Sequence, residues 1–129
     1  MFLLSLLLID ACSTYVLPRS RTVSIEAETD MLTYQYIQQI SNKIEIIGAA
    51  RYPDLYKEIR VSSQIDIELV INSSGKLESA RLLKSSKQTI LDKKILDIVR
   101  YAAPYPPFPD DLKLDRLIIH KSWQFIPNN

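Results

Sequence analysis

The side chains that could carry out chemistry in this sequence are few and far apart. It has one histidine, His120, and one cysteine, Cys12. A nucleophile with a neighbouring base would need to join two segments that have no reason to meet. Two glycines, Gly48 and Gly75, are too few for a glycine-rich phosphate loop. We therefore predict a protein that is not an enzyme, with no catalytic residue, no metal ligand and no cofactor.

The adjacent carboxylates Asp110 and Asp111 are a further candidate for acid–base chemistry. They follow the segment AAPYPPFP, residues 102–109, which holds four of the seven prolines. Carboxylates beside such a loop are usually solvated turn residues. The proline run could be a ligand for a proline-binding module, a linker between domains or a connector within one. We predict a connector, because a helix ends near Ala102 and a strand begins near Leu114, and each needs the other for its core.

Length and charge narrow the class of protein further. The chain has 129 residues, of which 47% are hydrophobic, enough for one modest core. Sixteen basic and fifteen acidic side chains leave a net charge of +1. The net charge is therefore too small to attract phosphates or to draw the protein to an anionic surface, and we predict no nucleic-acid partner.

The N-terminal run MFLLSLLLI, residues 1–9, is apolar and is followed by Asp10. As a helix it would measure roughly 14 Å, against about 30 Å for the core of a bilayer. Three interpretations stay open. The run is a secretion signal cleaved near Ala11 to Ser13, a segment whose Cys12 carries a lipid, or the apolar part of a longer protein.

Hydrophobic spacing predicts an extended lead-in over residues 14–25 and then a helix over 29–51. Thr29 or Asp30 can cap this helix, and Gly48 would end it in the left-handed conformation. A short second helix is predicted to begin at Tyr52–Pro53. Isoleucines spaced by three, four and three residues form one face of the long helix: Ile37, Ile40, Ile44 and Ile47.

From residue 64 the period changes to two, which predicts a half-buried strand containing Ile65, Ile67, Leu69 and Ile71. The turn formers of residues 72–75 then reverse the chain into a return strand over 77–85 with a bulge near Ser79. An amphipathic helix follows, with Asp92 on its solvent side. In the last strand every second side chain is predicted to point toward the core: Leu117, Ile119, Lys121, Trp123 and Phe125. We expect the amine of Lys121 to extend past the sheet into water.

This order predicts an α+β fold with a small antiparallel three-stranded sheet, helices packed on one face and an additional N-terminal helix before it. We divide the chain into an apolar segment and lead-in (1–28), the N-terminal helix (29–51) and a C-terminal domain (52–129). The last strand is expected to be an edge of the sheet. An edge with unpaired backbone groups either faces water or pairs with an extended segment of another protein.

From Tyr52 to Phe125 the sequence resembles the C-terminal domain of TonB, the periplasmic energy transducer of Gram-negative bacteria. The shared features occur in family order: Tyr52–Pro53 before a short helix, an alternating strand, a turn followed by Gly75-Lys76-Leu77, the segment LLKSS, Leu91–Asp92 at a helix start, the proline run, and a final Trp123-Gln124-Phe125. The segment RTVSIEAET also looks like what precedes this domain in one branch of the family.

The resemblance implies a non-enzymatic adaptor that binds TonB-dependent outer-membrane transporters for iron-siderophores or vitamin B12. The N-terminal box of the transporter would pair with the last strand, with a further contact near Tyr52. The site residues that it implies are Tyr52, Pro53, Leu114, Asp115, Arg116, Leu117, Ile118, Ile119, His120, Lys121 and Ser122. It also implies a periplasmic location in a Gram-negative bacterium, at the inner membrane if the chain is anchored.

Family transducers carry an N-terminal transmembrane helix and a long proline-rich spacer, which this sequence does not show. We therefore expect contact with an ExbB/ExbD-type motor only if a membrane anchor exists upstream. The alternative function is a structural periplasmic or lipid-anchored module that forms a homodimer through the same strand edge. Ser63, where the family usually has glycine, would stiffen the start of the first long strand.

Overall fold

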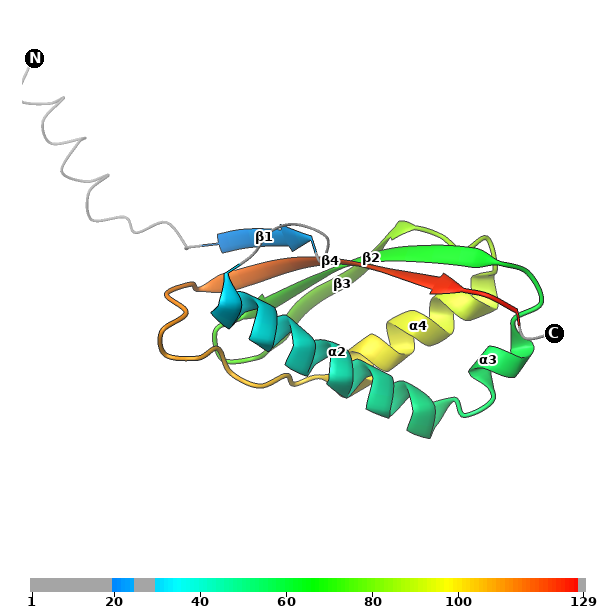
Figure 1. Cartoon of the computed structure of the whole chain (residues 1–129), viewed down its shortest axis with the longest axis horizontal. Helices are drawn as coiled ribbons and strands as arrows, with labels where there is room; N and C mark the ends of the chain where they lie inside the picture. Colours follow the sequence, from blue (N-terminus) through cyan, green and yellow to red (C-terminus); the bar gives the residue numbers. More distant parts are fainter. Residues whose placement is uncertain (1–19, 25–29, 128–129) are drawn as a thin grey trace, which may run out of the picture.

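The computed structural model describes residues 20–24 and 30–127 of the chain, as a sheet with helices on one of its faces (Figure 1). In chain order the elements are β1 (Ser20–Ser24), α2 (Met31–Arg51), α3 (Leu55–Glu58), β2 (Ser63–Asn72), β3 (Leu77–Lys84), α4 (Thr89–Ala102) and β4 (Arg116–Phe125).

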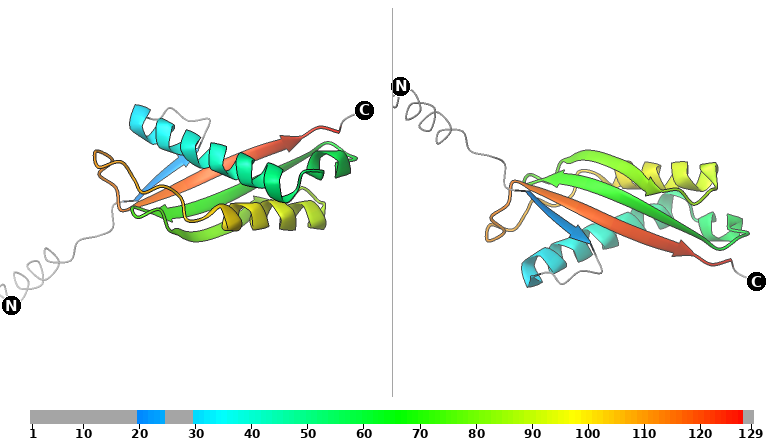
Figure 2. Two further views of the ribbon diagram at one scale, coloured as in Figure 1. Left: turned by 90° about the horizontal axis from the view of Figure 1, so that it is seen from below. Right: turned by 90° about the horizontal axis from the view of Figure 1, so that it is seen from above.

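The sheet has four strands in the order β1-β4-β2-β3. β2 is antiparallel to both of its neighbours, whereas β1 is parallel to β4. The predicted three-stranded antiparallel sheet is therefore wrong in strand number and in orientation. The lead-in supplies the extra strand, because a short extended segment without an apolar period can still pair through its backbone. Both long helices lie on the same face of the sheet, as the two views in Figure 2 show.

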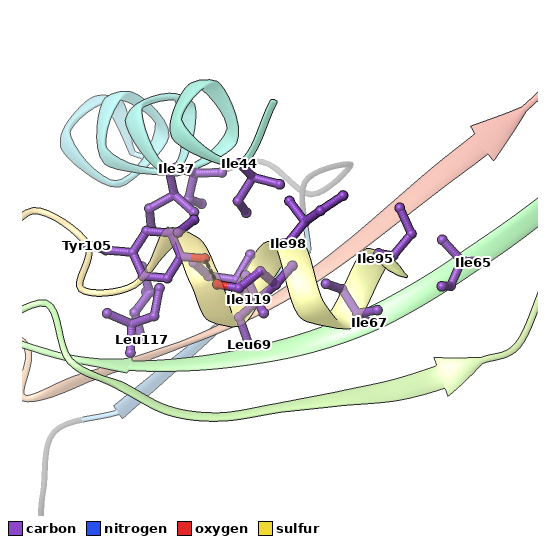
Figure 3. Packing of buried hydrophobic residues seen from close by; sticks show 14 of the residues in the cluster. Ile37, Ile44, Ile65, Ile67, Leu69, Ile95, Ile98, Tyr105, Leu117 and Ile119 are labelled. Atoms are coloured by element: carbon purple, nitrogen blue, oxygen red, sulfur yellow. Dashed lines mark hydrogen bonds between the residues drawn. The ribbon is translucent and has the colours of Figure 1, made fainter. Parts of the chain in front are cut away.

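The core lies between this face and the helices. Ile65, Ile67, Leu69 and Ile71 of β2 are all fully buried, as the two-residue period predicts. All four belong to one hydrophobic cluster with residues of both long helices. Figure 3 shows Ile65, Ile67 and Leu69 in this cluster with Ile37 and Ile44 from α2 and Ile95 and Ile98 from α4. Because α2 packs into the same hydrophobic cluster as the rest, the N-terminal helix and the predicted C-terminal domain share one core.

The β2–β3 hairpin follows the predicted chemistry of its turn. Gly75 has φ +91°, a conformation that residues with a side chain rarely adopt. Asn72 accepts hydrogen bonds from Ser74 N and Lys76 N at 3.0 Å each. The register shifts between Val70 and Ile71, which places the predicted bulge beside Ser79.

The ends of the helices correct three details. Asp30 caps α2 by accepting from Thr33 N at 3.0 Å, but α2 continues through Gly48 to Arg51, so the predicted stop at Gly48 is wrong. The helical hydrogen-bond ladder outweighs the modest cost of one internal glycine. The short helix α3 begins at Leu55 instead of at Tyr52–Pro53.

The third correction concerns Asp92, which is buried and not on the solvent side of α4. Its carboxylate accepts hydrogen bonds from Ser86 N at 2.9 Å and Ser86 Oγ at 2.6 Å, and also from Ser85 Oγ. Burial by itself raises the pKa of Asp92, but the bonds from both serines outweigh it and hold the pKa below its usual value. The carboxylate thus fixes the chain that enters α4.

The proline run is a connector that packs on the core. Tyr105 and Phe108 are buried, and Tyr105 Oη donates to the carbonyl oxygen of Val99 at 2.7 Å. Tyr36 Oη from α2 donates to the carbonyl oxygen of Pro106 at 2.7 Å. The segment therefore joins α4 to β4 while holding α2 in place.

Candidate strand-docking site

β4 is held firmly on one side. It pairs with β2 along its whole length, from Arg116 opposite Asn72 to Phe125 opposite Ser63. Leu117, Ile119 and Phe125 are buried beneath the helices. Both backbone pairing with β2 and side-chain burial therefore fix the position of β4 in the sheet.

That outer side is not an open edge over the predicted docking residues. β1 runs parallel to β4, with Ser20 beside Arg116, Thr22 beside Ile118 and Ser24 beside His120. The expectation that the last strand is an edge strand of the sheet is wrong over Arg116–His120, because the lead-in already pairs there. β1 lies alongside this part of β4 in Figure 1.

The first three residues of β1 lie at the surface, and one of them forms an ion pair with α2's cap. Ser20, Arg21 and Thr22 are exposed. Arg21 Nη1 donates to Asp30 Oδ2 at 2.5 Å and to Thr33 Oγ1 at 3.3 Å. About half of each partner in the Arg21–Asp30 ion pair is exposed to solvent (45% and 48%), and such pairs stabilise weakly.

A row of polar side chains crosses the solvent face of the sheet at His120. Glu68 on β2 contacts His120 Nε2 at 3.0 Å and accepts from Arg81 Nε on β3 at 2.8 Å. Hydrogen bonds from Arg81 and His120 hold the pKa of Glu68 below its usual value. His120 is thus placed by a carboxylate and belongs to a polar row across three strands.

Lys121 differs from its prediction. Its amine does not extend into water, because Nζ donates to Ser41 Oγ on α2 at 3.0 Å and lies 4.9 Å from the centre of the Trp123 ring. Burial lowers the pKa of Lys121, and the charge of Glu45 opposes that shift only in part. The helix α2, which covers this part of β4, shields the amine from solvent.

Beyond Lys121, an apolar groove of about 280 Å³ lies between the C-terminal half of α2 and the end of β4. Tyr52 lines it, and its hydroxyl donates to Asp97 Oδ2 at 2.8 Å. The other lining residues are Ile44, Glu45, Gly48, Ala49, Leu55, Ile95, Ile98, Trp123 and Phe125. Trp123 and Phe125 were not among the predicted site residues, although their inward parity and aromatic character in the sequence pointed to them.

The predicted site residues therefore fall into two groups. Tyr52 lies at the groove beside the C-terminal end of β4, next to the exposed Pro53, while Leu114 and Asp115 precede its first residue. Ten residues of strand separate these ends by roughly 33 Å. One strand-shaped partner would need to run along most of β4 to reach both groups.

A larger groove, of about 450 Å³, is formed by α3 and the start of α4. Its lining includes Leu55, Ile59 and Leu91, and none of its lining residues belongs to β4. Over residues 20–24 and 30–127, no group of three or more His, Cys, Asp or Glu side chains could hold a metal ion. The strand edge and the groove beside it remain the candidate site.

The profile of the Gram-negative bacterial TonB protein C-terminal family matches residues 48–127, more than half of the chain. The chain belongs to this family. Among solved structures, it is similar to the solution structure of the C-terminal domain of Helicobacter pylori TonB, residues 179–285 of that protein, with a TM-score of 0.57 and 17% identity. That likeness covers 81% of this chain and 98% of the other, and at this identity it supports the fold. No curated protein matches the sequence.

TonB C-terminal domains are non-enzymatic interaction domains that generally bind outer-membrane transporters, and the family points to the periplasm of Gram-negative bacteria. In the part of the chain that the structure describes, no helix is both long and apolar enough to cross a membrane.

Proposed function

We propose that this chain docks to TonB-dependent outer-membrane transporters by adding an extended transporter segment to the outer side of β4. The observation that supports the proposal is the pairing of β1 with Arg116–His120, because there a parallel strand of the same chain already pairs with this side of β4. Backbone hydrogen bonds of this kind give affinity with little demand on sequence.

The docking site proposed here keeps the two groups of residues distinct. Arg116–Ser122 would supply the backbone edge, with Leu114 and Asp115 leading into it. A segment that runs past Lys121 would place its side chains in the groove beside Trp123, in contact with Tyr52 and Pro53. An apolar groove next to a pairing edge suits an extended partner, since alternate side chains of an added strand face the helix layer.

The same proposal includes three further points: the transporters carry siderophores or vitamin B12, the chain acts in the periplasm, and it is linked to a proton-motive-force motor. Anchoring at the inner membrane would need a segment outside the described residues. The division at residue 52 is likewise proposed as the start of the docking domain, with α2 as an added element on its core.

Titration of the folded chain with transporter box peptides tests the proposal. The peptides come from the N-terminal periplasmic segments of the TonB-dependent transporters of the same bacterium. Amide chemical shifts along Leu114–Ser122 should change on binding, while those of β3, the opposite edge strand, should not. The single tryptophan, Trp123, reports independently, because a segment that fills the groove changes its fluorescence.

No shift change along β4 at millimolar peptide would contradict docking. A box peptide with proline at its central residues is the matched control, since proline cannot donate to the ladder.

The same edge favours one second candidate, self-association. A β1 strand that pairs with β4 of another copy would form a dimer by exchange. Sedimentation velocity over a wide range of protein concentration distinguishes the two, since a stable dimer that does not bind any box peptide would replace docking with a structural role.

A further inference from the structure

The docking edge proposed above already has an occupant within the same chain. β1 pairs with Arg116–His120, the centre of the proposed site. Two strands cannot pair with the same side of β4 at once, because each backbone group there forms its ladder bond with one neighbour. Either β1 leaves when a partner segment arrives, or the partner is confined to the rest of the edge.

β1 has the properties of a strand that can leave. It is five residues long, and Ser20, Arg21 and Thr22 are exposed. Arg21 forms a partly exposed ion pair with Asp30 and also contacts Thr33. A short terminal strand whose first three side chains are exposed opens at lower cost than the core strands.

β4, by contrast, does not depend on β1 for its position. Leu117 and Ile119 are 0% and 1% exposed, and β2 pairs with β4 over all ten residues of the strand. Removal of β1 therefore uncovers the edge without unpacking the core. Within residues 20–24 and 30–127, no strand pairs with the outer side of Lys121–Gln124, which gives an incoming segment a place to begin beside the groove.

We propose that β1 is a built-in competitor for the docking edge, and that an extended transporter segment binds β4 by displacing it. This inference rests on the proposed function and adds its regulation. Since only molecules with β1 detached can accept the segment, the apparent affinity is reduced by the fraction of molecules in that state.

The register of β1 also defines which segment fits. In a strand paired with β4, the residues beside Leu117 and Ile119 point to the face that α2 covers. The residue beside Ile118 points to the solvent face. In the backbone register, positions 21, 22 and 23 of β1 stand beside Leu117, Ile118 and Ile119. A competing segment is an extended one without proline, because its amides pair with β4. Since Ile119 is buried, an apolar residue suits the position beside it.

The test compares peptide affinities of full-length variants by calorimetry. Thr22→Pro with Val23→Pro weakens β1, because neighbouring amides point to opposite sides and one of the two must face β4. Thr22→Ala with Val23→Ala is the matched control, which removes the same side chains and keeps both amides. We expect the proline variant to bind box peptides about tenfold more tightly than the wild type, with the alanine variant in between or unchanged.

A reversible lock gives the opposite perturbation. In a Cys12→Ser background, Thr22→Cys with Ile118→Cys places a disulfide between neighbours in the parallel register. The oxidised protein should lose box-peptide binding over Arg116–His120, and reduction should restore it. The dispersed amide spectrum of β2 shows whether each variant is folded.

The outcomes separate the two claims. Equal affinity, within about twofold, for the proline variant and the wild type overturns the competition and leaves docking standing. Unchanged binding by the oxidised lock does the same. Failure of every folded variant to bind any box peptide overturns docking itself, and the competition with it.

Discussion

The amide of Tyr105 donates a hydrogen bond to the carbonyl oxygen of Gly75 at 2.8 Å. This bond joins the proline-rich connector to the β2–β3 turn, although the two are 30 residues apart (105 − 75). Phe108 N donates to the carbonyl oxygen of Ser73 at 2.9 Å in the same way. The turn and the connector therefore support each other, and both precede the strand proposed for docking.

Gly75→Ala is expected to be severely destabilising. A Cβ there would lie 2.0 Å from the carbonyl oxygen of Tyr105, on a backbone with φ +91°. We expect a loss of about 3 kcal/mol in the free energy of unfolding, measured by urea denaturation. Gly48→Ala in α2 is the control: its Cβ would meet Ile98 at 3.4 Å, and we expect a gain of about 0.5 kcal/mol from helix propensity. Equal effects of the two changes would contradict the role of Gly75.

Tyr105→Phe should cost about 1 kcal/mol of unfolding free energy, because the carbonyl oxygen of Val99 loses a buried hydrogen bond. Burial raises the pKa of this phenol well above its usual range, so it stays a neutral donor at physiological pH. Thermal unfolding measures the change. The exposed residue Tyr101 provides the comparison, since Tyr101→Phe should change stability by less than about 0.5 kcal/mol. A Tyr105→Phe variant as stable as the wild type would contradict a stabilising role for the hydrogen bond from Tyr105 to Val99.

Asp92→Asn should destabilise the protein by about 2 kcal/mol at pH 7, because three hydrogen bonds to a buried carboxylate are lost or weakened. The folded-state pKa of Asp92 lies below its usual value. Its contribution is therefore complete above the unfolded pKa of about 3.9 and is lost as the pH falls through the lower folded value.

Urea denaturation of wild type and Asp92→Asn at pH 7 and at acidic pH checks this sign. The difference in unfolding free energy between wild type and Asp92→Asn should shrink as the pH falls. Asp110→Asn, in the exposed turn after the prolines, should alter stability by less than about 0.5 kcal/mol at pH 7. A difference that grows toward acid pH would contradict the assignment.

Lys121→Met should stabilise the fold by about 1 kcal/mol at neutral pH, because methionine fills the space under α2 without a shielded charge. The folded-state pKa of Lys121 is lowered, so the unfolded chain binds more protons between that value and about 10.4. Wild-type stability then rises with pH in this window, and the advantage of methionine shrinks. Lys113→Met, at an exposed position, is the control, and a loss of stability in Lys121→Met would show that the Ser41 bond outweighs burial.

Local pattern determined much of this protein from the sequence alone. The alternation of Ile65 to Ile71 specified β2, because a strand that is buried on one face needs an apolar residue at every second position. The turn formers of residues 72–75 specified the β2–β3 turn, because glycine at position 75 readily adopts the positive φ that the turn needs. The ordered set of short motifs from Tyr52 to Phe125 specified the family.

The tertiary structure decided what has no local signal. By helical period Asp92 shares the buried face of α4 with Ile95 and Val99, but its charge predicts a solvent-facing residue. Only the hydrogen bonds from Ser85 and Ser86, which arrive from outside the helix, make its burial favourable. Lys121 is shielded because α2 crosses above it, which depends on contacts 80 residues apart in the chain. The lead-in became β1 because β4 offered an unpaired backbone edge. Backbone pairing of that kind depends on which strand lies alongside and leaves almost no trace in the side chains of the segment that pairs.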